Sequence, residues 1–480
     1  MKNLDLPSHI HIIGIAGVAT SALAIAFHKA GVKVTGSDKG FYPPVSTELE
    51  KQGISFYAGW HPEKMVDGGA PDVVMIGTAS GTQNPETLYI KEHNIPSYSY
   101  PEIIGKFFVK KNSIVCAGTW GKTTTSAILS HILLKAGFDP SYMFGGISLS
   151  HESAAHLGKS DWSVFEGDEY KSSPTDSRPK FAHYSPTHLL LTSVAWDHAD
   201  LYPTEKIYFD AFEKLVQGIP SDGLLVVNAD DDGVARVLRG ASKDKALEPR
   251  LIRYGKAMNA DYSYDNVQPS KDGLRFDISH NDKKTSISSP MLGRFNAENI
   301  TAAFAMASEL GVPAEKITAA IKDFKGIKRR LEKRFEGTVT VFDCHAPTPD
   351  KVASVLASLR EAYAKKIIAV FEPNIGGRER ASAAKYDNAF KDADAVIIPR
   401  LTKLKVANDQ RTVIDGQEKP MGGDELANVI GETQPSCTYE ENDDNLVSFL
   451  AFQAKKGDVI AFLGSHGFRG MIEEVVKKLT

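Results

Sequence analysis

Short apolar runs alternate with helical patterns along most of the chain. The runs at 9–15, 113–117 and 188–194 have the length and the branched apolar side chains of buried strands. In other stretches, such as 21–30 and 299–310, apolar residues recur every three or four positions, which predicts helices. Regular alternation of buried strands with helices is typical of parallel sheets, and the pattern therefore predicts an α/β fold.

Length and changes of pattern predict three domains. At 480 residues the chain is too long for one ordinary core. A lysine-containing segment at 107–112 precedes a new strand, and a basic segment at 326–334 precedes a third series of strands and helices. The more polar stretch 240–290 indicates a small antiparallel excursion. We predict three domains, with bounds at 1–110, 111–328 and 329–480.

Composition and charge exclude several classes of protein. The chain is 42% apolar and 24% charged, with a formal net charge of −4, as expected for a globular protein. No basic excess points to nucleic acid, and no apolar run approaches the roughly 20 residues of a membrane span. The start of the chain lacks a signal-peptide pattern, and Cys116, Cys344 and Cys437 stand singly. These features predict a cytoplasmic protein with no disulfide framework, no nucleic-acid partner and no membrane insertion.

A glycine-rich loop lies between the predicted strand 113–117 and the helix that follows it. Residues 118–125 are Gly-Thr-Trp-Gly-Lys-Thr-Thr-Thr. In such a loop the backbone N–H groups face an anion, Lys122 neutralises it, and the Thr123 hydroxyl can bind Mg²⁺. The general pattern has a glycine five positions before Gly121, where this chain has Cys116. The loop alone predicts a nucleotide phosphate site, with a plain strand–helix turn as the alternative.

Acidic residues follow two further predicted strands. Residues 166–169 are Glu-Gly-Asp-Glu, and residues 197–200 are Asp-His-Ala-Asp. Because ligands bind at the carboxyl ends of parallel strands, these carboxylates could hold Mg²⁺, with a neutral His198 as a further ligand. Zinc is disfavoured because no second His or Cys stands at ligand spacing. Taken singly, each acidic segment is also consistent with a solvated loop.

In combination these motifs resemble the Mur ligase family over nearly the whole chain. Residues 118–125 resemble the family's ATP loop, 197–200 its Asp-His-x-Asp motif and 293–299 its Gly-x-x-Asn-x-x-Asn motif. The segment 329–332, followed by Asp343, is similar to the opening of the family's third domain. The resemblance implies an N-terminal Rossmann-like domain for a UDP sugar, a central P-loop ATPase-like domain and a C-terminal Rossmann-like domain for the acceptor.

The resemblance also implies roles for single residues. The residues expected to bind ATP lie in the loop and in three later segments: Gly118, Thr119, Gly121, Lys122, Thr123, Thr124, Asn296, Asn299, Arg330 and Asp343. Asn296 and Asn299 are expected to face adenine, and the last two residues are expected to reach ATP from the third domain. The expected Mg²⁺ ligands are Thr123, Glu166 and His198. The expected catalytic residues are Lys122, Glu166 and His198.

The first predicted strand–helix turn offers a site for the UDP sugar. Gly14 and Gly17 place backbone N–H groups at a helix start, which suits a pyrophosphate, and Asp38 ends the next strand. A dinucleotide fingerprint requires three glycines, and Ala16 and Ala19 occupy the second and third of these positions. An NAD-dependent oxidoreductase is therefore a weaker alternative, and a merely tight turn at Gly17 is another.

Within the family, two stretches favour one reaction. Residues 166–170 and 176–184 resemble members that join UDP-N-acetylmuramate to the murein peptide L-alanyl-γ-D-glutamyl-meso-diaminopimelate. Members that attach L-alanine alone are the runner-up. Either reaction is expected to use ATP and Mg²⁺ and to pass through an acyl phosphate, which requires positioning and charge neutralisation rather than a protein nucleophile.

Two departures from the family pattern leave a third alternative open. Residues 343–349 are Asp-Cys-His-Ala-Pro-Thr-Pro, which lacks the paired histidines usual in the third domain. Trp120 stands in the phosphate loop where the family usually has a small residue, a polar residue or a histidine. A UDP-sugar-binding protein without turnover therefore remains an alternative to a ligase.

Overall fold

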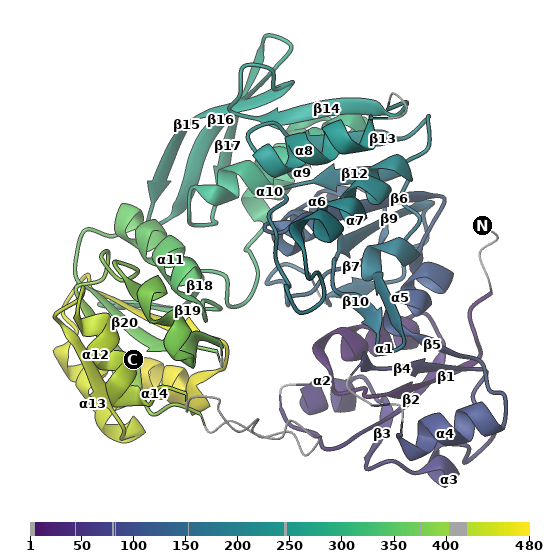
Figure 1. The fold of residues 1–480 in the computed structure, drawn as a ribbon, viewed down its shortest axis with the longest axis horizontal. Coiled ribbons are helices and arrows are strands. Elements are labelled where there is room, and N and C mark those ends of the chain that lie inside the picture. The colour runs from purple at the N-terminus through teal and green to yellow at the C-terminus, as the bar shows by residue number, and fades with distance from the viewer. Residues whose placement is uncertain are drawn as a thin grey trace. The chain divides into compact units, whose positions relative to one another are not determined.

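The structure is a computed structural model that describes residues 5–43, 45–78, 81, 83–151, 153–243, 247–374, 376–402 and 420–480. The chain forms two compact units. The first comprises Met1–Asn266, Phe276–Ser288 and Ala297–Lys325, and the second comprises Val267–Arg275, Ser289–Asn296 and Gly326–Thr480. Sheets with parallel strands and flanking helices occur in each of the three predicted regions, which confirms the α/β fold class (Figure 1).

The N-terminal sheet is parallel, with strand order β3-β2-β1-β4-β5. Its strands are β1 (His9–Ile13), β2 (Lys33–Asp38), β3 (Ser55–Ala58), β4 (Val73–Ile76) and β5 (Ser97–Ser99). Its helices are α1 (Val18–Lys29), α2 (Val45–Lys51), α3 (Pro62–Met65), α4 (Pro85–Glu92) and α5 (Tyr100–Ile103), followed by a π-helical turn, η2 (Ile104–Phe108). Because β2 and β4 lie on opposite sides of β1, the strand order reverses there. Such a reversal opens a crevice at the carboxyl ends of the strands, where the turn after β1 lies.

The central sheet has ten strands in the order β17-β16-β15-β14-β13-β12-β6-β9-β7-β8. The strands are β6 (Asn112–Ala117), β7 (Ser141–Met143), β8 (Ala155–His156), β9 (Trp162–Gly167), β12 (His188–Leu191), β13 (Leu224–Asn228), β14 (Arg250–Gly255), β15 (Tyr262–Ser270), β16 (Gly273–His280) and β17 (Lys283–Ser289). The helices are α6 (Lys122–Ala136), α7 (Glu205–Gln217), α8 (Asp232–Ala241), α9 (Phe295–Glu309) and α10 (Ala314–Asp323). β6 pairs in parallel with β12 on one side and β9 on the other. The chain segments that leave these three strands therefore emerge at one edge of the sheet.

Two smaller features complete the central region. The strands β15, β16 and β17 lie next to one another, joined by two-residue turns, and such short connections join antiparallel strands (Figure 1). At one of these turns, Asn281 and Asp282 have φ values of 47° and 60°, the left-handed conformation that a type I′ turn requires. A separate antiparallel pair, β10 (Lys171–Ser173) with β11 (Asp176–Pro179), follows β9 and leads into a 3₁₀ helix, η3 (Lys180–His183).

The C-terminal sheet has the order β18-β19-β23-β20-β21-β22, and only the β18–β19 pair is antiparallel. Its strands are β18 (Glu332–Glu336), β19 (Thr340–Cys344), β20 (Ile367–Glu372), β21 (Ala395–Pro399), β22 (Cys437–Glu440) and β23 (Val459–Gly464). The helices are α11 (Pro349–Ala362), α12 (Gly423–Gly431), α13 (Asp443–Gln453) and α14 (Met471–Leu479). Alternate residues of β20 enter two separate apolar cores, because successive side chains of a strand point to opposite faces. Both faces of this sheet are thus buried, as expected for the predicted Rossmann-like C-terminal domain.

Among the described residues, no helix is both long and apolar enough to cross a bilayer.

Candidate active site

The predicted phosphate loop joins the buried strand β6 to helix α6. Gly118 and Gly121 have φ values of 136° and 83°, which side chains other than glycine rarely adopt. Space also requires these glycines, since a Cβ atom would lie 2.3 Å from Thr192 Oγ1 at Gly118 and 2.6 Å from Asn299 Oδ1 at Gly121. The backbone of Trp120 is held in the loop, because its N–H donates to Ser193 Oγ (3.0 Å). The loop is therefore fixed against the segment that follows β12.

The predicted ATP ligands Thr119 and Thr124 are both buried. Thr119 Oγ1 accepts a hydrogen bond from Ala195 N–H (2.9 Å) and lies 2.9 Å from the Tyr208 hydroxyl. Its side chain thus secures the loop, and its backbone carbonyl accepts a hydrogen bond from Lys122 Nζ (3.1 Å). Thr124 lies in the first turn of α6, directly behind the N–H groups that would face a phosphate.

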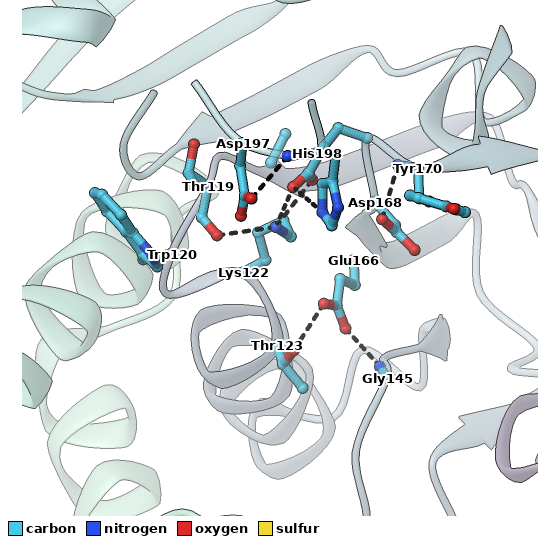
Figure 2. A network of polar contacts seen from close by, with 12 residues as sticks. Thr119, Trp120, Lys122, Thr123, Gly145, Glu166, Asp168, Tyr170, Asp197 and His198 are labelled. Carbon is cyan, nitrogen blue, oxygen red and sulfur yellow. Dashed lines mark hydrogen bonds and ion pairs between the residues drawn. The ribbon is translucent and has the colours of Figure 1, made fainter. Parts of the chain in front are cut away.

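The side chain of Lys122 forms an ion pair with a buried acid, Glu169. Glu169 was not among the catalytic residues predicted from the sequence. Lys122 Nζ lies 2.9 Å from Glu169 Oε2 and 3.1 Å from Glu169 Oε1, and the Glu169 side chain is only 2% exposed (Figure 2). His198 Nε2 lies 3.6 Å from the same carboxylate, at Oε1. The hydrogen bond with Glu169 raises the pKa of His198 above its ordinary value, against the opposing effect of burial. Glu169 therefore joins the loop lysine to the histidine of the segment after β12.

Thr123 and Glu166, two of the three predicted metal ligands, are in contact. Thr123 Oγ1 donates to Glu166 Oε1 (2.7 Å), and the N–H of Gly145 donates to the other oxygen of Glu166 (Figure 2). His198 instead lies beside Glu169, 3.6 Å from its carboxylate. Among the residues that the structure describes, no three acidic, histidine or cysteine side chains are grouped as a metal site. A hydroxyl and a carboxylate oxygen at a phosphate loop suit Mg²⁺, which keeps several water ligands and binds substrate phosphates.

The two predicted adenine residues are both buried. Asn299 lies beside the phosphate loop, where its Oδ1 accepts a hydrogen bond from Thr125 Oγ1 (3.4 Å). Asn296 belongs to the second compact unit, and its Nδ2 donates to the carbonyl of Leu292 (2.7 Å). Their predicted contact with adenine remains a prediction.

In the second compact unit, the predicted residue Asp343 is buried among arginines. Arg329 Nε lies 3.1 Å from Asp343 Oδ1, and Arg334 Nη1 lies 3.5 Å from Oδ2. The guanidinium of Arg329 also donates to three backbone carbonyls at the end of β23 and just after it, those of Gly464, Ser465 and His466. The predicted ATP ligand Arg330 is the next residue and is exposed. Its predicted contact with ATP remains a prediction.

The predicted UDP-sugar residues Gly14, Gly17 and Asp38 line one cavity of about 320 Å³. Asp38 also orders the turn after β1, because its Oδ2 accepts a hydrogen bond from the N–H of Ala16 (2.9 Å). Other parts of the N-terminal region complete the lining: Val18, Ala19, Thr20, Lys39, Trp60, Gly77, Thr78 and Tyr100. The strand–helix turn was the sequence signal for this cavity. Nothing in the sequence pattern pointed to the residues contributed by the later strands.

Comparisons with known proteins decide the family. A model of the Mur ligase family catalytic domain matches residues 9–111, one of the Mur ligase middle domain matches 116–307, and one of the Mur ligase glutamate ligase domain matches 329–466. The chain belongs to the Mur ligase family. Members of this family are ATP-dependent ligases that form amide bonds and generally use Mg²⁺, so the chain is an ATP-dependent carbon–nitrogen ligase. An NAD-dependent oxidoreductase, weighed above as an alternative, is not supported.

Relatives with two different acceptors resemble the chain to a similar degree. A UDP-N-acetylmuramate–L-alanyl-γ-D-glutamyl-meso-2,6-diaminoheptandioate ligase from Escherichia coli (strain K12) is 31% identical over 476 residues, covering 98% of both chains. A UDP-N-acetylmuramate–L-alanine ligase from Bradyrhizobium diazoefficiens is 35% identical over 401 residues, covering 81% of this chain and 82% of the relative.

Solved structures likewise include both kinds of ligase. A UDP-N-acetylmuramate–alanine ligase from Thermotoga maritima aligns with a TM-score of 0.76 at 22% identity, covering 98% of both chains. A murein peptide ligase from Psychrobacter arcticus 273-4 aligns with a TM-score of 0.68 at 26% identity, also covering 98% of both chains. The Mur ligase fold is common to these proteins, and the acceptor differs among them.

A buried carboxyl close to Asn299 provides a pH-dependent test of this region. Burial, followed by the charges of Asp230 and Asp231, raises the pKa of Glu298 from 4.5 to about 7. Because the folded chain favours the protonated form of Glu298, this carboxyl contributes to the free energy of unfolding. The contribution is complete below pH 4.5 and is lost as the pH rises through 7. We expect the melting temperature of Glu298→Gln, relative to the native chain, to increase between about pH 5 and about pH 8.

Thermal unfolding of both proteins across this range measures the effect. Glu315→Gln, at an exposed position of α10, is the matched control and should show no pH-dependent difference. A melting-temperature difference for Glu298→Gln that stays constant with pH would contradict the raised pKa.

Proposed function

We propose that the chain joins UDP-N-acetylmuramate to the murein peptide L-alanyl-γ-D-glutamyl-meso-diaminopimelate, as a step in peptidoglycan recycling. The observation that carries this proposal is the resemblance of residues 166–170, 176–181 and 183–184 to those of murein-peptide ligases. These residues also contact one another, since Lys180 pairs with Asp168 and His183 Nε2 lies 3.2 Å from Asp176 Oδ2. The Escherichia coli relative with this activity is similar over 98% of both chains, which agrees with the same choice, although the alanine ligase from Thermotoga maritima aligns over the same share.

The proposed first step activates the sugar carboxylate. One of its oxygens attacks the γ-phosphorus of ATP, the bond to the β,γ-bridging oxygen breaks, and ADP leaves with that electron pair. The N–H groups of the phosphate loop and the Lys122 ammonium would neutralise the transferring phosphoryl group. Thr123, Glu166 and His198 would hold Mg²⁺, which supplies positive charge to the phosphate oxygens when bound.

The proposed second step forms the amide. The free amine of the acceptor attacks the acyl carbon, the carbon–oxygen bond to the phosphate breaks, and inorganic phosphate leaves as the amine loses a proton. Asn296 and Asn299 would face adenine, and Arg330 and Asp343 would contact ATP. Gly14, Gly17 and Asp38 would bind the UDP portion in the cavity that they line. The roles of these residues are proposed by resemblance.

The second candidate is a ligase that attaches L-alanine alone. The Bradyrhizobium diazoefficiens relative with that activity is 35% identical, a higher value than the murein-peptide relative reaches, although over a shorter part of the chain. Both candidates share ATP and UDP-N-acetylmuramate, and they differ only in the amine. A UDP-sugar-binding protein without turnover is tested by the same measurement.

The acceptor is identified by measuring ADP release with each amine in turn. With ATP, Mg²⁺ and UDP-N-acetylmuramate present, we expect turnover with the tripeptide and little or none with L-alanine. Turnover with L-alanine alone would establish the second candidate. Tight UDP-N-acetylmuramate binding without ADP release for either amine would favour a binding protein.

The phosphate loop is tested by Lys122→Ala. Because the Lys122 ammonium would act on charge that develops during phosphoryl transfer, its removal should lower kcat by about 100-fold or more. Binding of UDP-N-acetylmuramate, measured without ATP, should stay unchanged, since its proposed cavity is lined by other residues. Lys159→Ala, outside the loop, is the control for the loss of a lysine. Native kcat in Lys122→Ala would contradict the proposed role of the loop.

A further inference from the structure

Lys180 carries a positive charge close to the proposed catalytic acids, and no role has yet been given to it. It opens the 3₁₀ helix η3, its side chain is only 13% exposed, and its ammonium forms an ion pair with Asp168. The backbone reinforces this pair, because the N–H of Lys180 donates to the carbonyl of Tyr170 (3.1 Å). Lys180 is thus held against the segment that contains Asp168. Glu166 lies in the same segment, two residues before Asp168.

Two tyrosine rings flank the same ammonium. Lys180 Nζ lies 5.4 Å from the centre of the Tyr100 ring and 5.7 Å from the centre of the Tyr170 ring. Such distances allow attraction between the cation and the faces of the rings. Tyr100 also lines the cavity proposed for the UDP sugar. Lys180 is not itself a lining residue, but it lies next to Tyr100 in the cavity wall and pairs with Asp168 of the acid-rich segment.

Burial, followed by the charges of Asp168 and Glu166, raises the pKa of the Tyr100 hydroxyl well above its ordinary value. A substrate carboxylate that enters from the cavity towards these two acids would be stabilised by a nearby cation. Lys122 is assigned to the phosphates of ATP, so it does not serve this purpose in the proposed reaction.

Lys180 has the capacity to bind a second anion. An ammonium group has three N–H donors, and within the described part of the chain Asp168 is the acceptor that the Lys180 ammonium contacts by hydrogen bonding. The ion pair with Asp168 holds the ammonium near the rings of Tyr100 and Tyr170.

We propose that Lys180 binds the carboxylate of the nucleotide-sugar substrate and orients it for attack on ATP. The proposal rests on the proposed function, since that function requires a substrate with a free carboxylate at this end of the cavity. Asp168 acts as a positioning residue for the ammonium, which also lies close to the rings of Tyr100 and Tyr170. Lys180 would thereby distinguish an N-acetylmuramyl sugar from a sugar that lacks the lactyl carboxylate.

A pair of ligands isolates this carboxylate. UDP-N-acetylmuramate and UDP-N-acetylglucosamine share the UDP and the amino sugar, and only the first carries the lactyl group. Binding of each is measured by calorimetry without ATP and Mg²⁺, for the native chain, Lys180→Met, Lys180→Arg and Lys171→Met. Lys171, on β10 nine positions earlier, is the matched control for the loss of a lysine near the same hairpin.

We expect Lys180→Met to weaken UDP-N-acetylmuramate binding about tenfold, the effect of losing one charge-assisted hydrogen bond. Binding of UDP-N-acetylglucosamine should be unchanged in this variant. Lys180→Arg retains the charge and should keep most of the preference for UDP-N-acetylmuramate, and Lys171→Met should behave as the native chain.

Several outcomes would overturn the proposal. An equal loss for both ligands would mean that Lys180 contacts the part they share, and no loss for either would mean that it contacts neither. If thermal unfolding shows that Lys180→Met does not fold, Lys180→Gln, which keeps a hydrogen-bond donor and removes the charge, is measured in the same way. If the native chain binds neither ligand, the proposed function fails instead.

Discussion

The ion pair between Lys122 and Glu169 connects the parts of the candidate site. Lys122 begins helix α6 after β6, whereas Glu169 follows β9, the neighbouring parallel strand. Both side chains are largely buried, so the loss of either partner would leave an uncompensated charge, at a cost of about 3–5 kcal/mol. Because His198 contacts the same carboxylate, this one acid sets the positions of a phosphate-loop cation and of a residue after β12.

The fold makes this arrangement possible through its strand order. β9, β6 and β12 are consecutive neighbours in the central sheet, and all three run parallel. Their carboxyl ends therefore bring together three segments that are far apart in the sequence. The N-terminal cavity follows the same rule, since Gly14 and Asp38 come at the carboxyl ends of adjacent strands. The proposed site for phosphate transfer and the proposed cavity for the sugar nucleotide thus lie at the same kind of sheet edge.

The sequence predicted the fold class, the phosphate loop and the proximity of Thr123 to Glu166, because these follow from periodicity, glycine spacing and the strand-end rule. It did not predict the part played by Glu169, since periodicity does not say which of several neighbouring acids turns inward. It also did not predict that Arg329, whose φ of 61° is left-handed, contacts Asp343. The assignment of Arg330 to ATP remains a prediction. Pro349 is the first residue of α11, where proline is favoured, but this accounts for neither Pro347 nor Thr348 in place of the paired histidines.

The central claim is that the sugar carboxylate itself attacks ATP. Isotope transfer tests it most directly: UDP-N-acetylmuramate labelled with ¹⁸O in its lactyl carboxylate is turned over with ATP, Mg²⁺ and the tripeptide, and the inorganic phosphate is analysed by mass spectrometry. The account predicts that each phosphate released carries one oxygen from the labelled carboxylate, because the carbon–oxygen bond of the acyl phosphate breaks when the amine attacks. Amide formation with phosphate that carries no ¹⁸O would contradict an acyl-phosphate route.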